Sequence, residues 1–262
     1  MITEIKNKSF SNGIVYALKT RDGYPIETTD TFLPYYTKFC INEHTNELKE
    51  HKLGSRKERW MIGVSVMSGC PVRCRFCATG KLKQWRNLTA DEIVAQVEFI
   101  LNKNKDFNPL EAQEFKINYT RMGEPFLNIE EVVKAIQILN NKFKNIHHYI
   151  STVGITNSDF NFISDNITLQ LSLHAMNDEK RDWLIPYKNK LSIEDLGKIR
   201  TKSNLKTTIN LTLVDEKDFD INVLQQYFDK ECFFIKLSPI NPNEISNNNK
   251  LGKGIIESKN IL

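Results

Sequence analysis

Short hydrophobic runs alternate with helix-type segments along most of this chain, and no other feature of the sequence limits its fold as strongly. Six of these runs indicate β-strands, at residues 60–66, 115–120, 148–152, 168–173, 207–213 and 233–237. Each is followed or preceded by a helix-type segment, an order that is typical of a parallel sheet in an α/β protein. Six units are too few for a complete eight-stranded barrel. We therefore predict a partial (β/α)6 barrel, with an open sheet as the alternative.

Capping residues indicate where several helices begin. Thr89 and Glu92 have the spacing of a capping box, and apolar residues recur at helical intervals as far as residue 101. Asn128, with Glu131 three residues later, is expected to cap the helix that follows the second strand. We expect further helices at residues 157–164, 192–202 and 219–229.

The residues before the first of these strands follow a different pattern. Residues 13–19 and 24–29 are short extended runs joined through Asp22 and Gly23, which is a typical hairpin turn. Residues 30–59 are largely polar, lack clear periodicity and indicate an irregular insertion. We therefore predict three parts: an N-terminal β-hairpin extension with its insertion at 1–59, a core at 60–242 and a short tail at 243–262.

The chain is expected to reside in the cytoplasm and to have no contact with a membrane. No apolar run approaches the roughly 20 residues that a membrane-spanning helix needs, and residues 1–11 lack the apolar segment of a signal peptide. Three of the five cysteines fall within eight residues. In a cytoplasmic protein this grouping indicates metal or redox chemistry rather than disulfides.

Polar or glycine-rich segments follow five of the six predicted strands. They are residues 67–80, 121–125, 151–154, 172–175 and 238–242. In parallel α/β folds the loops after the strands converge at one edge of the sheet, where ligands bind. We therefore expect these five segments to form one site.

The first of these segments carries the cysteines in the pattern Cys70-x3-Cys74-x2-Cys77. A structural zinc site is normally closed by four ligands, and no fourth cysteine or histidine lies nearby. Three thiolates suit a [4Fe–4S] cluster whose fourth iron stays open for another ligand. The pattern therefore favours an iron–sulfur cluster over zinc.

Positive charge is concentrated around the cysteines. Residues 52–86 contain nine Lys or Arg and one acid, Glu58, so this segment carries a net charge of +8 in a chain of +4. Such an excess suits a polyanionic substrate, with Trp60 and Trp85 as candidate stacking partners for bases. A solvated basic surface would give the same pattern.

These motifs occur in the order of a known family. The cysteine pattern, with Phe76 before the last cysteine, resembles the radical S-adenosylmethionine superfamily. Within it, residues 64–242 are similar to the methyltransferases that modify C2 or C8 of adenosine in 23S ribosomal RNA. The matching segments are residues 68–81, 86–90, 122–125, 172–175 with 177–179, and 241–242. Residues 22–23 and 26–28 also resemble a family hairpin that carries a glutamate near the substrate.

The resemblance implies a radical enzyme with two cofactors. Cys70, Cys74 and Cys77 would hold a [4Fe–4S] cluster, and S-adenosylmethionine would bind its fourth iron and be cleaved to a 5′-deoxyadenosyl radical. The family pattern implies cofactor contacts for Gly123, Glu124, Ser151, Ser172, Leu173, His174 and Asn241, and an acid–base role for Glu27. It also implies an RNA or nucleotide substrate and a flavodoxin-type electron donor.

Two cysteines that the family uses for methyl transfer have no counterpart in this sequence. The resolving cysteine lies seven residues before the first cluster cysteine, where this chain has Gly63, and no cysteine follows Cys232. Cys232 is expected to be a small buried residue before a strand, and Cys40 lies in the irregular insertion. Methyl transfer is therefore not expected, and the radical would act on the substrate itself.

Three functions are compatible with the sequence. Modification of an RNA base or nucleotide is favoured by the basic segment and by the family. Action on a peptide or a small metabolite is favoured by the missing methyl-carrying cysteine. A non-catalytic iron–sulfur protein is the third, and the sequence does not specify an oligomeric state.

Overall fold

The six predicted strands all form and lie side by side in one sheet. The computed structural model describes residues 2–34, 53–212, 219–238, 240 and 243–251. The six strands are β4 (Arg59–Gly63), β7 (Glu114–Tyr119), β8 (Ile146–Thr152), β9 (Ile167–Ser172), β10 (Thr207–Leu211) and β11 (Phe233–Leu237). They pair in parallel in this order. The prediction of a parallel α/β sheet of the partial-barrel type is confirmed.

Three N-terminal strands extend the same sheet. They are β1 (Thr3–Phe10), β2 (Gly13–Lys19) and β3 (Pro25–Leu33), and the predicted hairpin is the antiparallel pair β2–β3. Strand β3 also pairs with β4, antiparallel, so the full order is β1-β2-β3-β4-β7-β8-β9-β10-β11. The sequence did not predict β1, because most of its side chains are exposed and show no alternation of polar and apolar residues. The proposed division at residue 59 stays a prediction.

The six helices among the described residues differ in how closely they match the predictions from the sequence. They are α1 (Ala90–Lys103), α2 (Ile129–Lys142), α3 (Asp178–Leu184), α4 (Ile193–Gly197), α5 (Ile221–Tyr227) and α6 (Glu244–Asn248). The capping box of α1 is confirmed, with the Thr89 hydroxyl accepting from Glu92 N at 3.2 Å. Asn128 is the N-cap residue of α2, but its side chain makes no cap hydrogen bond and instead donates to Val66 O and Leu88 O, at 2.8 Å each. It therefore ties α2 to the loop after β4.

Two helix predictions differ from the structure. Residues 157–164 form turns, because the Asp159 carboxylate accepts from Asn161 N at 2.8 Å and so competes with a helical hydrogen bond. Helix α4 ends at Gly197 rather than near residue 202. A Cβ at Gly197 would lie 2.1 Å from Tyr227 O, so this helix end is packed against the end of α5.

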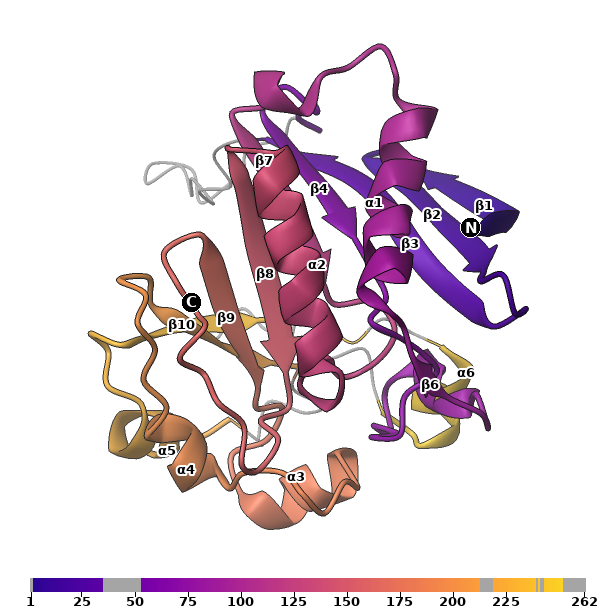
Figure 1. Ribbon diagram of the computed structural model, residues 1–262. Coiled ribbons are helices and arrows are strands. Elements are labelled where there is room, and N and C mark those ends of the chain that lie inside the picture. The colour runs from indigo at the N-terminus through magenta and orange to yellow at the C-terminus, as the bar shows by residue number, and fades with distance from the viewer. Residues whose placement is uncertain (1, 35–52, 213–218, 239, 241–242, 252–262) are drawn as a thin grey trace, which may run out of the picture.

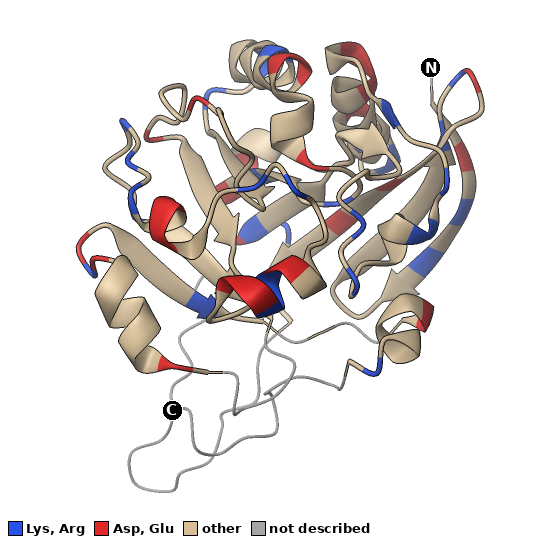
Figure 2. Cartoon of the chain, turned by 90° about the horizontal axis from the view of Figure 1, so that it is seen from below, with Lys and Arg blue, Asp and Glu red and all other residues tan. Residues whose placement is uncertain are grey.

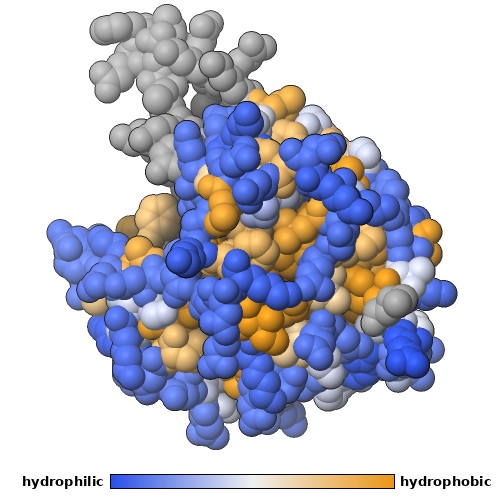
Figure 3. Space-filling model, turned by 45° about the horizontal axis from the view of Figure 1, so that its top comes forward, coloured by the Kyte–Doolittle hydropathy of each residue, from blue (hydrophilic) through white to orange (hydrophobic). Residues whose placement is uncertain are grey.

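The hydrophobic core lies between the sheet and helices α1 and α2, which cover the same face (Figure 1). Tyr16 of β2 meets Phe99 of α1 with ring centroids 5.2 Å apart, so the N-terminal strands share this core. Hydrophilic residues cover most of the face shown in Figure 3, and hydrophobic residues show between them. None of the described helices is long and apolar enough to cross a membrane.

The segments that follow the parallel strands gather at one edge of the sheet, at the lower end in Figure 1. A short pair, β5 (Met67–Ser68) with β6 (Arg86–Asn87), and the 3-10 turn η1 (Ala78–Lys81) lie there beside α6. Two further 3-10 turns, η2 (Pro109–Glu111) and η3 (Pro125–Leu127), precede β7 and α2. The predicted convergence of polar loops is therefore present in the fold.

Candidate active site

The cysteine loop follows β4 and brings three free thiols to one cavity. Cys70, Cys74 and Cys77 are half-buried and line a cavity of about 130 Å³. One backbone hydrogen bond lies within the loop, from Cys77 N to Cys74 O at 3.1 Å. A second connects the loop to the end of α3, from Arg75 N to Leu184 O at 2.9 Å. The end of α3 therefore helps to hold the shape of this loop.

Burial disfavours the thiolate form of Cys70 and Cys74 when no cation is bound. Burial raises the pKa of Cys70 to about 12 and holds the pKa of Cys74 well above its ordinary value. Thiolates rather than thiols bind metals, so a cation must displace these protons. Within the described residues, no group of three Cys, His, Asp or Glu could hold a single metal ion. A [4Fe–4S] cluster would instead take one thiolate at each of three irons.

Gly123 and Glu124 follow β7 and face the same cavity. Gly123 has φ +103°, and a Cβ there would lie 2.6 Å from Met67 Cβ, so glycine is needed for the close approach of two loops. Glu124 is 4% exposed, and its carboxylate accepts from Phe126 N at 3.1 Å and from Val153 N at 2.9 Å. Burial raises the pKa of Glu124 to about 7. A carboxyl so placed can hold an amino group.

The ends of β8 and β9 add hydroxyls to the cavity. The Ser151 and Ser172 hydroxyl oxygens lie 3.2 Å apart, and the Gln170 amide donates to Ser151 Oγ at 2.7 Å. The side chain of Leu173 is fully buried and lines neither this cavity nor the larger one beside it. Its backbone N–H donates to Asn210 O at 3.0 Å. The cofactor contact proposed for Leu173 therefore stays a prediction.

His174 has one ring nitrogen that is bound by the backbone of Thr212. Its Nδ1 accepts from Thr212 N at 3.1 Å, so the neutral ring carries its proton on Nε2. Burial lowers the pKa of His174 to about 3, which keeps the ring neutral at physiological pH. The Phe76 ring packs edge-on against it, with centroids 4.8 Å apart. The imidazole is thereby held as a neutral donor.

A larger cavity of about 660 Å³ adjoins the first and contains Glu27. The residues that line both cavities are Phe76, Cys77, Thr79, Thr120, Arg121, Ser151, Ser172 and His174. The lining of the larger cavity is rich in hydroxyl and amide side chains, including Gln170, Asn210, Thr212 and Ser238. Asn241 and Cys40, which the sequence also singled out, lie outside the described residues.

Arg121 is the site residue that sequence reasoning missed. It follows β7, crosses the end of β4 and donates from Nη2 to the Glu27 carboxylate on β3. It can cross there because β4 carries Gly63 at this point, where a Cβ would lie 3.0 Å from Arg121 Cδ and 2.4 Å from Thr29 Oγ1. The absence of a side chain at Gly63 thus leaves the space that the Arg121 side chain occupies. The two residues are distant in the sequence and come into contact only in the folded chain.

Four of the nine cations in the basic segment around the cysteines pair with acidic side chains among the described residues. Arg56 pairs with Asp30, Arg59 with Glu114 and Lys81 with Glu244. Arg86 pairs with both Asp22 and Glu92. Trp60 is fully buried and its indole N–H donates to Asp30 at 2.8 Å, so it cannot stack on a base. Trp85 is 49% exposed. Of the two candidate stacking residues, Trp85 is therefore the one that a base could contact.

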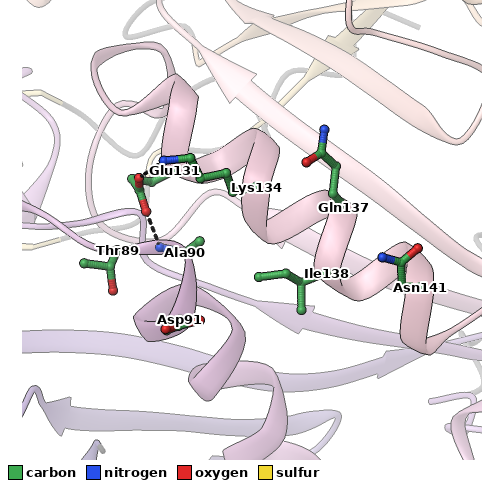
Figure 4. Close-up of a pocket in the computed structure, with 8 residues that line it drawn as sticks. All are labelled: Thr89, Ala90, Asp91, Glu131, Lys134, Gln137, Ile138 and Asn141. Atoms are coloured by element: carbon green, nitrogen blue, oxygen red, sulfur yellow. Dashed lines mark hydrogen bonds and ion pairs between the residues drawn. The ribbon is translucent and has the colours of Figure 1, made fainter.

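A separate groove lies between the first turn of α1 and the side of α2, along which it extends from Glu131 to Asn141 (Figure 4). Its lining includes the Glu131 carboxylate, which accepts from Ala90 N at 2.7 Å and from Lys134 at 2.6 Å. The groove has a volume of about 440 Å³ but shares no lining residue with the two cavities and contains no cysteine. It is a contact between two helices rather than a part of the site.

Comparisons with known proteins match the fold and the cysteine loop to one family. A family model described as the radical SAM superfamily matches residues 64–226. A probable dual-specificity RNA methyltransferase RlmN of Thermotoga sp. (strain RQ2) is 35% identical over 219 residues, 79% of this chain and 62% of that protein. A protein of the same description in Thermotoga maritima is 38% identical over 220 residues, again 79% of this chain and 62% of that protein. The chain thus spans about three-fifths of the length of these curated relatives.

A solved structure extends the comparison to three dimensions. A radical SAM methyltransferase from Sphaerobacter thermophilus superimposes with a TM-score of 0.67 and 26% sequence identity. The match covers 92% of this chain and 67% of that one.

Proposed function

We propose that this chain, which belongs to the radical SAM superfamily, cleaves S-adenosylmethionine reductively and uses the resulting radical to modify an RNA base. The superfamily is characterised by a [4Fe–4S] cluster and S-adenosylmethionine, and both are cofactors of this enzyme. One observation carries the proposal. The cavity lined by the three thiols and the larger cavity that contains Glu27 share a wall, which is formed in part by Cys77, Arg121 and Ser151. A radical formed at the first cavity would reach a substrate in the second.

Cys70, Cys74 and Cys77 are the proposed ligands of the cluster. When bound, the cluster supplies the electron that cleaves a carbon–sulfur bond of S-adenosylmethionine. The Glu124 carboxylate would accept hydrogen bonds from the amino group of that cofactor. Ser151, Ser172 and the Nε2–H of His174 would bind its carboxylate and ribose oxygens. Gly123 would act indirectly, by allowing the backbone before Glu124 to pack against Met67.

An RNA base is the substrate that two observations favour. The two curated relatives described above are named as RNA methyltransferases. The larger cavity is lined by amides and hydroxyls, and the only acidic and basic side chains among its described lining residues, Glu27 and Arg121, neutralise each other. Such a cavity suits a neutral polar group such as a base. Glu27 would accept or donate a proton there.

Thiol-resolved methyl transfer does not form part of this proposal. The position at which the family keeps its resolving cysteine is Gly63, and a side chain there would collide with Thr29 and Arg121. The 5′-deoxyadenosyl radical would therefore take a hydrogen atom from the base, which releases 5′-deoxyadenosine and leaves the unpaired electron on the base. A flavodoxin-type donor of the electron completes the proposed reaction.

The function is tested by incubating anaerobically reconstituted protein with dithionite, methyl-labelled S-adenosylmethionine and ribosomal RNA. We expect release of 5′-deoxyadenosine and a mass change in one nucleoside, with no labelled methyl group on the RNA. Release of 5′-deoxyadenosine without any changed nucleoside would instead favour a peptide or a small metabolite as the substrate. Labelled methyl on the RNA would show that the thiol-free route is wrong.

Replacing any one of Cys70, Cys74 and Cys77 by Ala should abolish the binding of about four irons and the broad absorption near about 400 nm. Cys232→Ala is the matched control, because Cys232 lines neither cavity and should leave the iron content unchanged. Iron content is measured after anaerobic reconstitution. Stoichiometric zinc without iron in the unmodified protein would contradict the cluster assignment.

A further inference from the structure

The open face of the N-terminal sheet carries cations that have no ion-pair partner in the part of the chain that the structure describes. This face is the one turned away from α1, and residues that lie opposite each other on paired strands share it. Lys6 and Lys8 on β1 lie opposite Ala17 and Val15 on β2, and Lys19 lies two residues beyond Ala17. All three lysines are exposed, and none has an ion-pair partner among the described residues. Figure 2 shows blue segments on the strand nearest the N-terminus.

The acidic side chains of these strands are already paired, so they do not offset the lysines. Glu4 pairs with Lys103 at the end of α1, and Asp30 pairs with Arg56. In the hairpin turn, Asp22 pairs with Arg86, whereas the exposed Arg21 has no acidic partner among the described residues. In the basic segment beside the cysteines, by comparison, four of the nine cations are paired among the described residues.

The same face leads into the larger cavity. Lys6, Ala17 and Glu27 form one row across β1, β2 and β3. Because adjacent strands lie about 4.8 Å apart, the Lys6 backbone is roughly 10 Å from that of Glu27. Lys19 pairs with Pro25, two residues before Glu27, so a cation also flanks the cavity on the side of the hairpin turn.

An exposed aromatic ring accompanies the lysines. Phe10 lies two residues after Lys8 on β1 and opposite Gly13, so it shares the open face, and it is 53% exposed. The Lys8 ammonium lies 5.3 Å from the centre of its ring. A cationic track with an exposed ring is the combination that binds single-stranded nucleic acid through phosphates and base stacking.

We propose that the open face of the N-terminal sheet, with Lys6, Lys8, Lys19 and Phe10, binds a single RNA strand whose target base enters the cavity beside Glu27. The inference rests on the proposed function and adds to it the surface that holds the RNA backbone. It separates two tasks: the lysines bind phosphates outside the cavity, and the neutral cavity receives the base.

The test measures binding of a fluorescent 12-nucleotide single-stranded RNA of mixed sequence to the anaerobically reconstituted protein, by anisotropy from 50 to 200 mM KCl. A variant with Lys6→Gln, Lys8→Gln and Lys19→Gln should bind at least tenfold more weakly at 50 mM KCl. The slope of log affinity against log salt should fall by about 0.7 for each lost phosphate contact. Phe10→Ala should weaken binding about tenfold and leave the slope unchanged.

The matched control carries Lys105→Gln, Lys144→Gln and Lys202→Gln. These exposed lysines lie in the loops that enter β7, β8 and β10, at the edge of the sheet opposite the cavities, and removing them changes the net charge equally. The control should keep the affinity and the slope. An equal loss in both variants, or an unchanged slope in the first, would overturn the inference.

Two further outcomes separate this inference from the proposed function. If polyglutamate competes as well as the RNA does, the face binds an acidic protein and the RNA assignment is wrong. If the unmodified protein changes a nucleoside of ribosomal RNA while the lysine variant binds RNA normally, the function stands and the surface does not. If RNA binding depends on the lysines but no nucleoside changes, the surface stands and the function fails.

Discussion

Gly63 shows how a missing side chain lets two others meet. The Arg121 side chain passes over this glycine to reach the Glu27 carboxylate, and Gly63 N donates to Thr29 Oγ1 at 3.2 Å. The strand end is therefore filled by its neighbours, and a larger residue at position 63 has no space. The Arg121 guanidinium in turn fixes the orientation of the Glu27 carboxylate at the cavity.

Gly63→Ala should therefore destabilise the protein by about 1–3 kcal/mol, the usual cost of adding a methyl group to a packed site. The added Cβ would lie 2.4 Å from Thr29 Oγ1, so one of the two groups must move. Urea unfolding followed by tryptophan fluorescence measures the change. The double variant Gly63→Ala, Thr29→Ala removes the collision and should recover part of the loss. An unchanged stability in the single variant would mean that the strand end is more loosely packed than described.

Glu124 gives the site a dependence on pH. Burial raises its pKa to about 7, so lowering the pH from 8 to 6 converts most of the carboxylate to the neutral acid. The neutral acid is a weaker acceptor for the amino group of S-adenosylmethionine. The affinity for this cofactor should therefore rise from pH 6 to pH 8, by up to about tenfold from Glu124 alone.

Glu124→Gln is the reference for this measurement, because the titration of the cofactor itself is common to both proteins. Equilibrium dialysis of the two reconstituted proteins at pH 6, 7 and 8 should give a flatter profile for the variant. Equal iron contents confirm that the cluster is intact in both. Parallel profiles would remove Glu124 from the cofactor site.

At the scale of elements, the start of α1 connects three parts of the fold. The Glu92 side chain accepts from Thr89 N at 3.0 Å and is also held by Arg86, which binds Asp22 in the β2–β3 turn at 2.6 Å. The Arg86 guanidinium lies 4.9 Å from the centre of the Tyr24 ring. This helix start therefore fixes the N-terminal hairpin next to the cysteine loop.

Thr89→Ala should cost about 1 kcal/mol of stability, because it removes the oxygen that accepts from Glu92 N. Thr89→Ser keeps that oxygen and should retain most of the stability. The two variants are compared by urea unfolding. A loss of the same size in both would assign the effect to the methyl group of Thr89 rather than to the cap.

At the scale of the whole molecule, the N-terminal strands are part of the main sheet. Leu18 and Ile26 are buried in the common core, and the buried carboxylate of Asp30 accepts from the indole of Trp60 on β4. Removing β1 to β3 would expose the edge of β4 and leave Trp60 without this partner. The hydrophobic core formed by the residues after position 60 would then be exposed to solvent where the N-terminal strands now cover it.

A chain without residues 1–33 should consequently be insoluble or should lack a cooperative unfolding transition. A chain without residues 1–11 loses only the exposed strand β1 and should still fold, which makes it the control. Solubility and near-ultraviolet circular dichroism distinguish the two. A soluble and cooperative product from the longer deletion would show that the N-terminal strands fold as a separate unit.

The sequence by itself determined the features that depend on local order. Hydrophobic runs and capping residues are local signals, so they predicted the six parallel strands and the start of α1. The spacing of Cys70, Cys74 and Cys77 is local as well, because a single loop carries all three to one cavity. Parallel strands then bring the loops that follow them to one edge, which is why Glu124, Ser151 and His174 could be expected there.

Only the tertiary structure decided which distant groups meet. Strand β1 shows no alternation because most of its side chains are exposed, so its pairing with β2 is visible only in the sheet. Lys81 and Glu244 are paired across 163 positions, and Arg121 reaches Glu27 across 94. An ion pair depends on distance in space, for which the sequence has no periodic signal. For this reason only the fold shows that Arg56, Arg59, Lys81 and Arg86 are paired, while Lys6, Lys8 and Lys19 have no ion-pair partner among the described residues.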